Sequence, residues 1–265
     1  MTVDDKSVSG SLVVPTLRQN VSFLNIDFNT SSRQDILTAL CELSASRSHS
    51  YIVTPNVDHI VMLDGLPDIE IRRRFADAYN RAVIRLCDSR ILSALARLQG
   101  IILPVFPGSD LTAHLVSECF DEQVKVAIVG GTATSLMKLR ALFPLPNFVQ
   151  FVPPMGVLNN ANAIAEITDF LYDAQADFVL MAIGAPQSEI IADICHRDGR
   201  FGGVSLCIGA SIEFLTGEKQ RAPIWVQRVS LEWAYRLLTE PRRLWRRYLI
   251  RGPRILKIFI QGGVR

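Results

Sequence analysis

The feature that most constrains the fold is a series of short, almost wholly apolar segments separated by stretches with helical spacing. Segments such as Lys125–Val129, Phe178–Ile183 and Val204–Ile208 contain few polar residues, and each is followed by a glycine-containing turn. A strand that is apolar at nearly every position is buried on both faces, as it is in a parallel sheet covered by helices. The sequence therefore predicts an α/β fold with a Rossmann-like, mostly parallel sheet and helices on both faces.

The first half of the chain is expected to follow the same alternation with less regular strands. Val21–Phe28 alternates apolar and polar residues, which is typical of an edge strand. Ser32 is a favourable N-cap for a helix that continues to Ser44. Helices are also expected at 57–63, 68–80, 91–98 and 161–174. Two more are expected after the glycine-containing turns at 130–132 and 184–186, ending at 142 and 195. Strands are expected at 51–55, 82–86 and 147–152.

Ligands of parallel sheets bind at the carboxyl ends of the strands, so the loops after the strands hold the candidate site residues. Thr54 and Asn56 follow a predicted strand and could either bind sugar hydroxyls or cap the next helix. Asp88 also follows a strand and could act as a general base or as an N-cap. His59 is more typical of a packed helix residue than of a catalyst.

Three glycine-containing turns could present backbone N–H groups to phosphate. The turn at Gly130 and Gly131 matches neither the dinucleotide nor the P-loop fingerprint, so tight turning is its simpler explanation. The turn at Gly184 precedes a predicted helix with Glu189 in its first turn, where a carboxylate also complements the helix dipole. After the third turn, Glu213 lies among apolar residues and could bind a ribose diol.

The charged residues are distributed unevenly along the chain. From Arg242 to Arg265 there are seven arginines, one lysine and no carboxylate, whereas the rest of the chain carries 20 basic and 26 acidic residues. Two arginine pairs lie four positions apart in this segment: Arg242, Arg243, Arg246 and Arg247. This spacing predicts that both pairs lie along one side of a helix and bind a diphosphate or an anionic membrane surface. The alternative is a solvated basic helix that packs on its own body.

Composition argues against several other classes of protein. The five cysteines are scattered, with no CxxC or Cys/His cluster, which argues against a zinc site and indicates reduced thiols. The chain has no run of about 18 uncharged apolar residues, so no transmembrane helix is expected. Its first residues lack the pattern of a signal peptide. A soluble or peripheral protein without a metal ion or cofactor is expected.

Several motifs occur in a fixed order between about Val21 and Phe259. They are Thr54–Asn56, Asp88, Pro107–Leu111, Gly130–Gly131, Gly184–Pro186 with Glu189, Gly209 with Phe214–Gly217, Arg221–Arg228, Leu231–Leu237 and Glu240–Leu249. In this order the motifs resemble those of the WecG/TagA/CpsF family of inverting glycosyltransferases, and the last three are the most specific. The resemblance covers nearly the whole chain.

The resemblance implies a Rossmann-like catalytic domain, expected at 19–220, and a helical appendage at 221–265 that completes the active site and touches the membrane. A flexible arm is expected at 1–18. The family's reaction would be metal-independent, inverting transfer from a UDP-sugar to a polyprenyl-diphosphate-linked saccharide. This places the protein in cell-surface or exopolysaccharide biosynthesis, at the cytoplasmic face of the membrane.

The resemblance also implies residue roles. Asp88 matches the aspartate proposed as the family's general base, and the arginines of the C-terminal segment would neutralise a diphosphate. The residues expected to bind the donor are Thr54, Asn56, Gly130, Gly131, Gly184, Gln187, Glu189 and Glu213. Two departures leave the donor sugar open: the segment around Val105 lacks an arginine common in the family, and the family's glutamine falls on Ser188, with Gln187 one position earlier.

Two other classes of function are alternatives to this one. A nucleic-acid-binding module could use the basic segment, with Trp245 and Tyr248 as stacking residues. The acidic body and the glycine turns at the strand ends argue against it, and no nucleic-acid partner is expected. A nicotinamide-dependent dehydrogenase is disfavoured because the dinucleotide fingerprint is missing.

Overall fold

A computed structural model describes residues 17, 19–144, 146–223, 225–226 and 231–264. The expected arm at 1–18 lies outside these residues except for Leu17. The division into an arm, a catalytic domain at 19–220 and an appendage at 221–265 stays a prediction. Within the described residues, no helix is both long enough and apolar enough to cross a lipid bilayer.

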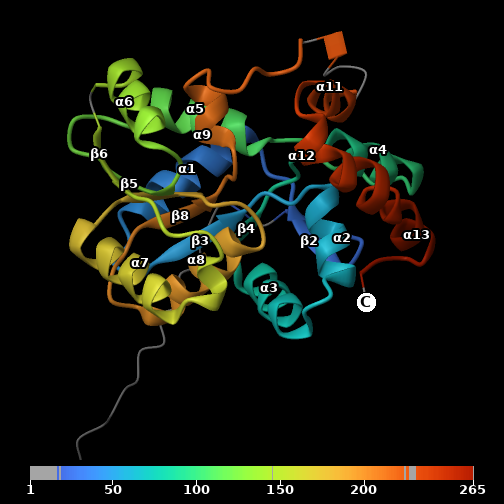
Figure 1. The fold of residues 1–265 in the computed structure, drawn as a ribbon, viewed down its shortest axis with the longest axis horizontal. Helices are drawn as coiled ribbons and strands as arrows, with labels where there is room; N and C mark the ends of the chain where they lie inside the picture. Colours follow the sequence, from blue (N-terminus) through green and yellow to red (C-terminus); the bar gives the residue numbers. More distant parts are fainter. Residues whose placement is uncertain (1–16, 18, 145, 224, 227–230, 265) are drawn as a thin grey trace, which may run out of the picture.

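A six-stranded sheet with only parallel pairings forms the centre of the fold, in the order β4-β3-β8-β7-β5-β6 (Figure 1). The expectation of a parallel, Rossmann-like sheet is confirmed. Its strands are β3 (Ser50–Val53), β4 (Ile84–Arg85), β5 (Lys125–Gly130), β6 (Asn147–Phe151), β7 (Phe178–Ala182) and β8 (Val204–Cys207).

Helices cover both faces of this sheet, and alternate residues of each strand point into the two layers. On one face, Val53 and Met181 pack against α2 (Val57–Gly65), α3 (Ile69–Arg81), α4 (Arg90–Leu98), α7 (Ala161–Ala174) and α8 (Gln187–Asp198). On the other face, Ile52 and Leu180 pack against α1 (Arg33–Ser44), α5 (Gly108–Glu118), α6 (Ala133–Leu142) and α9 (Ser211–Leu215). Ser32 caps α1 as expected, with its side chain accepting from the backbone N–H of Asp35.

The expected single edge strand at Val21–Phe28 is wrong. The segment forms a two-stranded antiparallel hairpin of β1 (Asn20–Phe23) and β2 (Ile26–Asn29), separate from the main sheet. The chain reverses at Leu24 and Asn25, which have φ angles of 54° and 62°. Two consecutive residues with positive φ are typical of the tight turns that join hairpin strands. The helix α5 at Gly108–Glu118 was not anticipated either.

The C-terminal segment lies over the carboxyl ends of the strands and is held there by apolar contacts. It contains α11 (Glu232–Thr239), α12 (Pro241–Trp245), the π-helical turn η2 (Arg246–Arg251) and α13 (Arg254–Ile260). Ile255 and Ile258 are buried in the layer that contains α2, and α13 packs directly on α2 (Figure 1). The hairpin holds the end of this segment, because Asn25 donates a side-chain hydrogen bond to the carbonyl oxygen of Val264.

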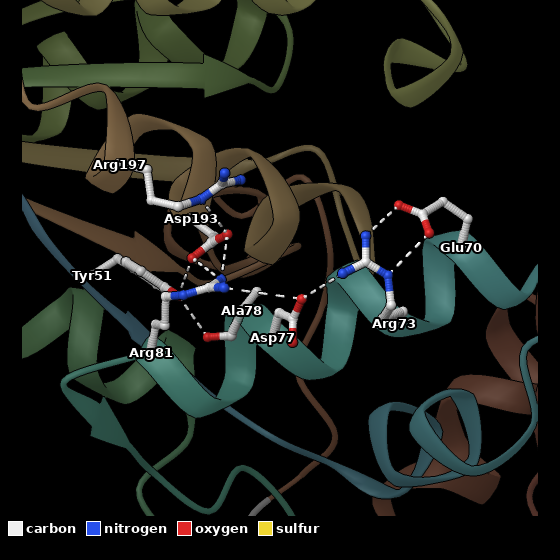
Figure 2. A network of polar contacts seen from close by, with 8 residues as sticks. All are labelled: Tyr51, Glu70, Arg73, Asp77, Ala78, Arg81, Asp193 and Arg197. Atoms are coloured by element: carbon white, nitrogen blue, oxygen red, sulfur yellow. Dashed lines mark hydrogen bonds and ion pairs between the residues drawn. The ribbon is translucent and has the colours of Figure 1, made fainter.

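A network of charged side chains joins α3 to α8 and to β3 (Figure 2). The carboxylate of Asp193 is 5% exposed and accepts hydrogen bonds at 3.0 Å from Arg81 and from Arg197. The hydroxyl of Tyr51 lies 3.1 Å from the same carboxylate and 2.6 Å from the carbonyl oxygen of Ala78. The buried carboxylate of Asp193 therefore links α8 to α3 and to β3.

We predict that Asp193→Ala lowers the free energy of unfolding by about 1–3 kcal/mol, because it removes hydrogen bonds between a buried carboxylate and two guanidinium groups. Urea denaturation followed by circular dichroism measures this change. Glu70→Ala is the matched control, because it breaks an exposed ion pair with Arg73 in the same network. The control is expected to leave stability close to the parental value, because solvent screens an exposed ion pair. Equal losses for the two variants would contradict the prediction.

Candidate active site

A cavity of about 760 Å³ lies at the carboxyl ends of the strands, beneath the C-terminal segment. Its floor comes from the loops after β3, β4, β7 and β8, and its roof comes from α11, α12, η2 and α13. The volume is in the usual range for small-molecule sites. The polar residues that line it, together with one glycine, include Thr54, Asn56, Asp58, His59, Asp88, Gly184, Glu189, Glu232, Arg236, Arg243, Arg247 and Arg251.

Asp88 lies in the floor of the cavity, between β4 and α4. Its backbone N–H donates to the carbonyl oxygen of Pro55 at 2.9 Å, which joins the loop after β4 to the loop after β3. Ser89 caps α4, with its hydroxyl accepting from the backbone N–H of Leu92 at 3.3 Å. The capping alternative for Asp88 is therefore wrong, and its carboxylate is not used by the helix.

The environment of Asp88 makes its carboxyl group a weaker acid than usual. Burial and the nearby charge of Glu232 raise the pKa of Asp88 to about 7, while the charges of Arg236 and Arg247 act in the opposite direction. A carboxyl group with this pKa exchanges protons readily near neutral pH. The roof of the cavity thus supplies both the carboxylate and the guanidinium groups that adjust the pKa of a group in the floor.

The loop after β3 brings Thr54 and Asn56 to the cavity. The side-chain oxygen of Asn56 accepts from the backbone N–H groups of Asp58 and His59 at 3.0 and 3.4 Å, so Asn56 caps α2. The hydroxyl of Thr54 donates to the carbonyl oxygen of Cys207 at 2.9 Å and ties β3 to β8. Both side chains therefore have structural contacts, and both also line the cavity.

The first turn of α8 places Glu189 at the back of the cavity. This residue is 2% exposed, and its Oε2 atom has no hydrogen-bond partner within the described part of the chain. Burial raises the pKa of Glu189 to about 7. Gly184, in the turn before this helix, also lines the cavity, whereas Gln187 does not.

Two of the four predicted arginines reach the cavity. Arg243 and Arg247 line it, although Arg243 is also exposed and pairs with Glu240, whereas Arg242 and Arg246 lie outside the lining. The expectation that both pairs lie along one side of a helix is wrong. Residues four apart share a helix face, but neighbouring residues differ by about 100° around the axis, so each adjacent pair is split.

Other predicted donor-binding residues also lie outside the cavity lining. At Gly130, a Cβ atom would lie 2.7 Å from Cγ2 of Ile183, so this glycine permits close packing beside β7. Gly131 follows it at the end of β5, away from the cavity. Glu213 on α9 forms an ion pair with Lys219 at 3.1 Å. The structure thus gathers the ends of β3, β4, β7 and β8 but not the end of β5.

Several cavity residues were not singled out from the sequence. Asp58 contacts Arg247 at 3.2 Å and Arg251 at 3.8 Å, which links the floor to the roof. Glu232 and Arg236 line the cavity from α11. The four-residue spacing of Glu232 and Arg236 within a family-like motif was a signal for a shared helix face, but it did not indicate which face meets the site.

Buried polar atoms that make no hydrogen bond concentrate in this cavity. Among the described residues, six buried side-chain nitrogen or oxygen atoms have no hydrogen-bond partner. Four of these atoms belong to residues that line the cavity. Asp58 Oδ1 and Arg247 Nε still take part in the ion pairs of Asp58 with Arg251 and Arg247, whereas Glu189 Oε2 and Arg236 Nε are in no ion pair within the described residues. Buried polar groups without partners are costly, so this concentration indicates a site for a polar ligand. No cluster of three or more potential metal-ligating side chains occurs in the described ranges.

Comparison with known protein families relates the chain to a described family. The family model described as the glycosyl transferase WecG/TagA/CpsF family matches residues 21–265. The match covers nearly the whole chain and includes every residue of the floor and roof of the cavity. The resemblance inferred from the ordered motifs is therefore confirmed.

We predict that the stability of the fold decreases as the pH rises through about 7, because Glu189 binds its proton more tightly in the folded chain. The stabilisation from a raised carboxyl pKa is complete below the unfolded value near 4.5 and is lost above the folded value. Glu189→Gln mimics the protonated acid. It should match the parent at pH 5 and be more stable on the order of 2 kcal/mol at pH 8 in urea denaturation.

The exposed Glu70→Gln variant is the control for this pH series. Glu70 lies outside the cavity, and its pKa is lowered by a hydrogen bond from Arg73. It is therefore not expected to gain stability at pH 8. If Glu189→Gln showed no gain at pH 8 relative to pH 5, the raised pKa of Glu189 would be refuted.

Proposed function

The chain belongs to the WecG/TagA/CpsF family of glycosyl transferases, and we propose that it transfers a sugar, with inversion, from a UDP-sugar to a polyprenyl-diphosphate-linked saccharide. The product would serve the synthesis of a cell-surface polymer or exopolysaccharide. The observation that carries this proposal is the position of Asp88, a carboxyl group with a pKa near neutrality, in a cavity roofed by arginines.

In the proposed reaction Asp88 acts as the general base. Its carboxylate removes the proton from an acceptor hydroxyl, and the hydroxyl oxygen attacks the anomeric carbon from the side opposite the UDP group. The bond between the anomeric carbon and the diphosphate oxygen breaks, and UDP leaves with the bonding electrons. A base with a pKa near the working pH is suited to this proton transfer. A single displacement of this kind inverts the configuration of the anomeric carbon.

Positive charge for the departing diphosphate would come from the roof of the cavity. Arg236, Arg243, Arg247 and Arg251 all line the cavity, and guanidinium groups bind phosphoryl oxygens with two parallel hydrogen bonds. Fixed donors of this kind stabilise charge that develops in the transition state. We therefore propose that the reaction uses these arginines for the task that a divalent cation performs in other transferases.

The donor-binding part of the proposal is restricted to the predicted residues that line the cavity. These are Thr54, Asn56, Gly184 and Glu189, which lie at the ends of β3 and β7. Gly130, Gly131, Gln187 and Glu213 lie outside the cavity lining and have no place in the proposed donor pocket. The proposed donor pocket is thus smaller than the one expected from the sequence.

The outward face of α12 and η2 supports a peripheral position on an anionic membrane surface. Arg242 and Arg246 are exposed, and the guanidinium of Arg246 lies over the ring of Trp245 at 5.2 Å. Leu249 and Ile250, which follow in η2, are also more than half exposed. Cations beside exposed aromatic and aliphatic side chains are typical of surfaces that lie on lipid headgroups. We propose the cytoplasmic face of the membrane, where the nucleotide donor and the lipid-linked acceptor would meet.

We predict that Asp88→Asn lowers kcat for sugar transfer on the order of 10²–10⁴-fold, because the amide cannot accept the proton. For the parent protein, kcat/KM should rise with pH through about 7, as Asp88 loses its proton. Mass spectrometry of a short-chain polyprenyl-diphosphate-sugar acceptor incubated with a panel of UDP-sugars measures the product. Asp169→Asn, which changes an exposed aspartate paired with Arg200, is the control. Near-parental transfer by Asp88→Asn would exclude the base assignment.

A second prediction separates the inward arginines from the outward ones. The variant Arg243→Ala/Arg247→Ala should lose at least about 10-fold in affinity for UDP, because it removes two charge-assisted contacts to phosphate. The variant Arg242→Ala/Arg246→Ala should keep UDP binding and lose sedimentation with anionic vesicles at low salt. Isothermal titration calorimetry and vesicle sedimentation measure the two effects. Identical profiles for the two variants would contradict this division.

A further inference from the structure

His59 has an orientation within the cavity that its position in the sequence did not reveal. The residue lies in α2, is 9% exposed and lines the cavity. Its ring is held edge-on by Phe75 and Tyr79, with centroid distances of 6.2 and 6.4 Å and interplanar angles of 85° and 79°. Its Nε2 atom makes no hydrogen bond within the described residues and is not among the buried atoms without a partner, so this atom keeps accessible surface. The imidazole ring is therefore held in a fixed orientation.

A hydrogen bond from α3 decides which ring nitrogen carries the proton. The hydroxyl of Tyr79 lies 2.8 Å from Nδ1 of His59. Burial raises the pKa of Tyr79 well above its usual value, so the phenol keeps its proton. No other partner of this hydroxyl occurs in the part of the chain that the structure describes. The phenol therefore donates to Nδ1, since the reverse arrangement would leave a buried O–H group without an acceptor. The proton of the neutral imidazole is then on Nε2.

The remaining nitrogen is available to a ligand. Within the described residues, Nε2 of His59 has no hydrogen-bond partner. Burial first, and then the nearby charge of Arg247, lower the pKa of His59 to about 3, so the ring is neutral near pH 7. This neutral N–H donor and the guanidinium group of Arg247, which contacts Asp58 at 3.2 Å, line the same cavity. Two donors that line one cavity, one of them cationic, are suited to an anionic oxygen.

We propose that His59 binds a phosphoryl oxygen of the bound diphosphate through Nε2–H, together with Arg247. Tyr79 is the positioning residue that holds His59 in the tautomer with the proton on Nε2. The inference rests on the proposed function for the identity of the ligand, since the diphosphate is that of the sugar nucleotide. It adds a neutral donor from the floor of the cavity to the cationic donors of the roof. A bound diphosphate would then join α2 to the C-terminal segment.

Calorimetric titration of the full chain with inorganic diphosphate tests the contact without any sugar transfer. His59→Phe keeps the aromatic packing and removes the N–H donor, so the Kd should rise roughly 10- to 100-fold. Tyr79→Phe should give a smaller rise, because the unpinned ring populates both tautomers. His114→Phe, which changes an exposed histidine paired with Glu118, should leave the Kd unchanged. Circular dichroism verifies that each variant is folded. Parental affinity in His59→Phe would overturn the proposal.

Nitrogen NMR of the ¹⁵N-histidine-labelled chain tests the tautomer directly and does not depend on the ligand. The resonance lost in His59→Phe should show a protonated Nε2 and an unprotonated Nδ1, and it should not titrate between pH 5 and 8. In Tyr79→Phe the same signal should become an average of the two tautomers. A proton on Nδ1 in the parent would overturn the positioning role of Tyr79.

The outcomes of these tests separate this inference from the proposed function. If inorganic diphosphate binds through His59 but no UDP-sugar is consumed, the transferase proposal fails and the diphosphate contact stands. If sugar transfer occurs and His59→Phe binds diphosphate as the parent does, only the inference about His59 fails.

Discussion

The burial of a few apolar side chains holds a strongly cationic segment over the open ends of the sheet, and the site depends on it. Leu244, Ile255 and Ile258 are each at most 5% exposed, although they belong to a stretch with eight cations and no carboxylate. Full burial of such a side chain contributes roughly 1.5–3 kcal/mol, which offsets the repulsion among the neighbouring charges. The hairpin at the other end of the described chain secures this arrangement through Asn25 and Val264. Without these contacts the cavity would have a floor but no roof.

The charged groups of the packed C-terminal segment form ion pairs with the floor of the cavity and alter the pKa of a carboxyl group there. Asp58 contacts Arg247 and Arg251 across the cavity, and the pKa of Asp88 is set partly by Glu232, Arg236 and Arg247 above it. The carboxyl groups of the floor are therefore not independent of the roof. The packing of one segment therefore both adjusts the pKa of Asp88 and brings guanidinium groups into the same cavity.

The helical geometry of α12 and η2 divides one run of arginines between two surfaces. Arg243 and Arg247 line the cavity, whereas Arg242 and Arg246 lie outside its lining, with Arg246 over the ring of Trp245. The same short stretch can thus contact a diphosphate on one side and a charged surface on the other. The proposed membrane position and the proposed chemistry are linked by this division, because the acceptor lipid would carry its diphosphate close to the headgroups.

By itself, the sequence determined the features that depend on neighbouring residues: apolar strands of a parallel sheet, the cap at Ser32, the cationic segment, and motifs whose order identifies the family. Only the tertiary structure decided that Ser89 rather than Asp88 caps α4, that Gly130 and Glu213 lie outside the cavity, and that Tyr79 orients His59. The physical reason is that these outcomes depend on packing. Local periodicity places a residue on an element, but contacts between elements far apart in the chain decide which faces meet and which polar atoms stay unpaired.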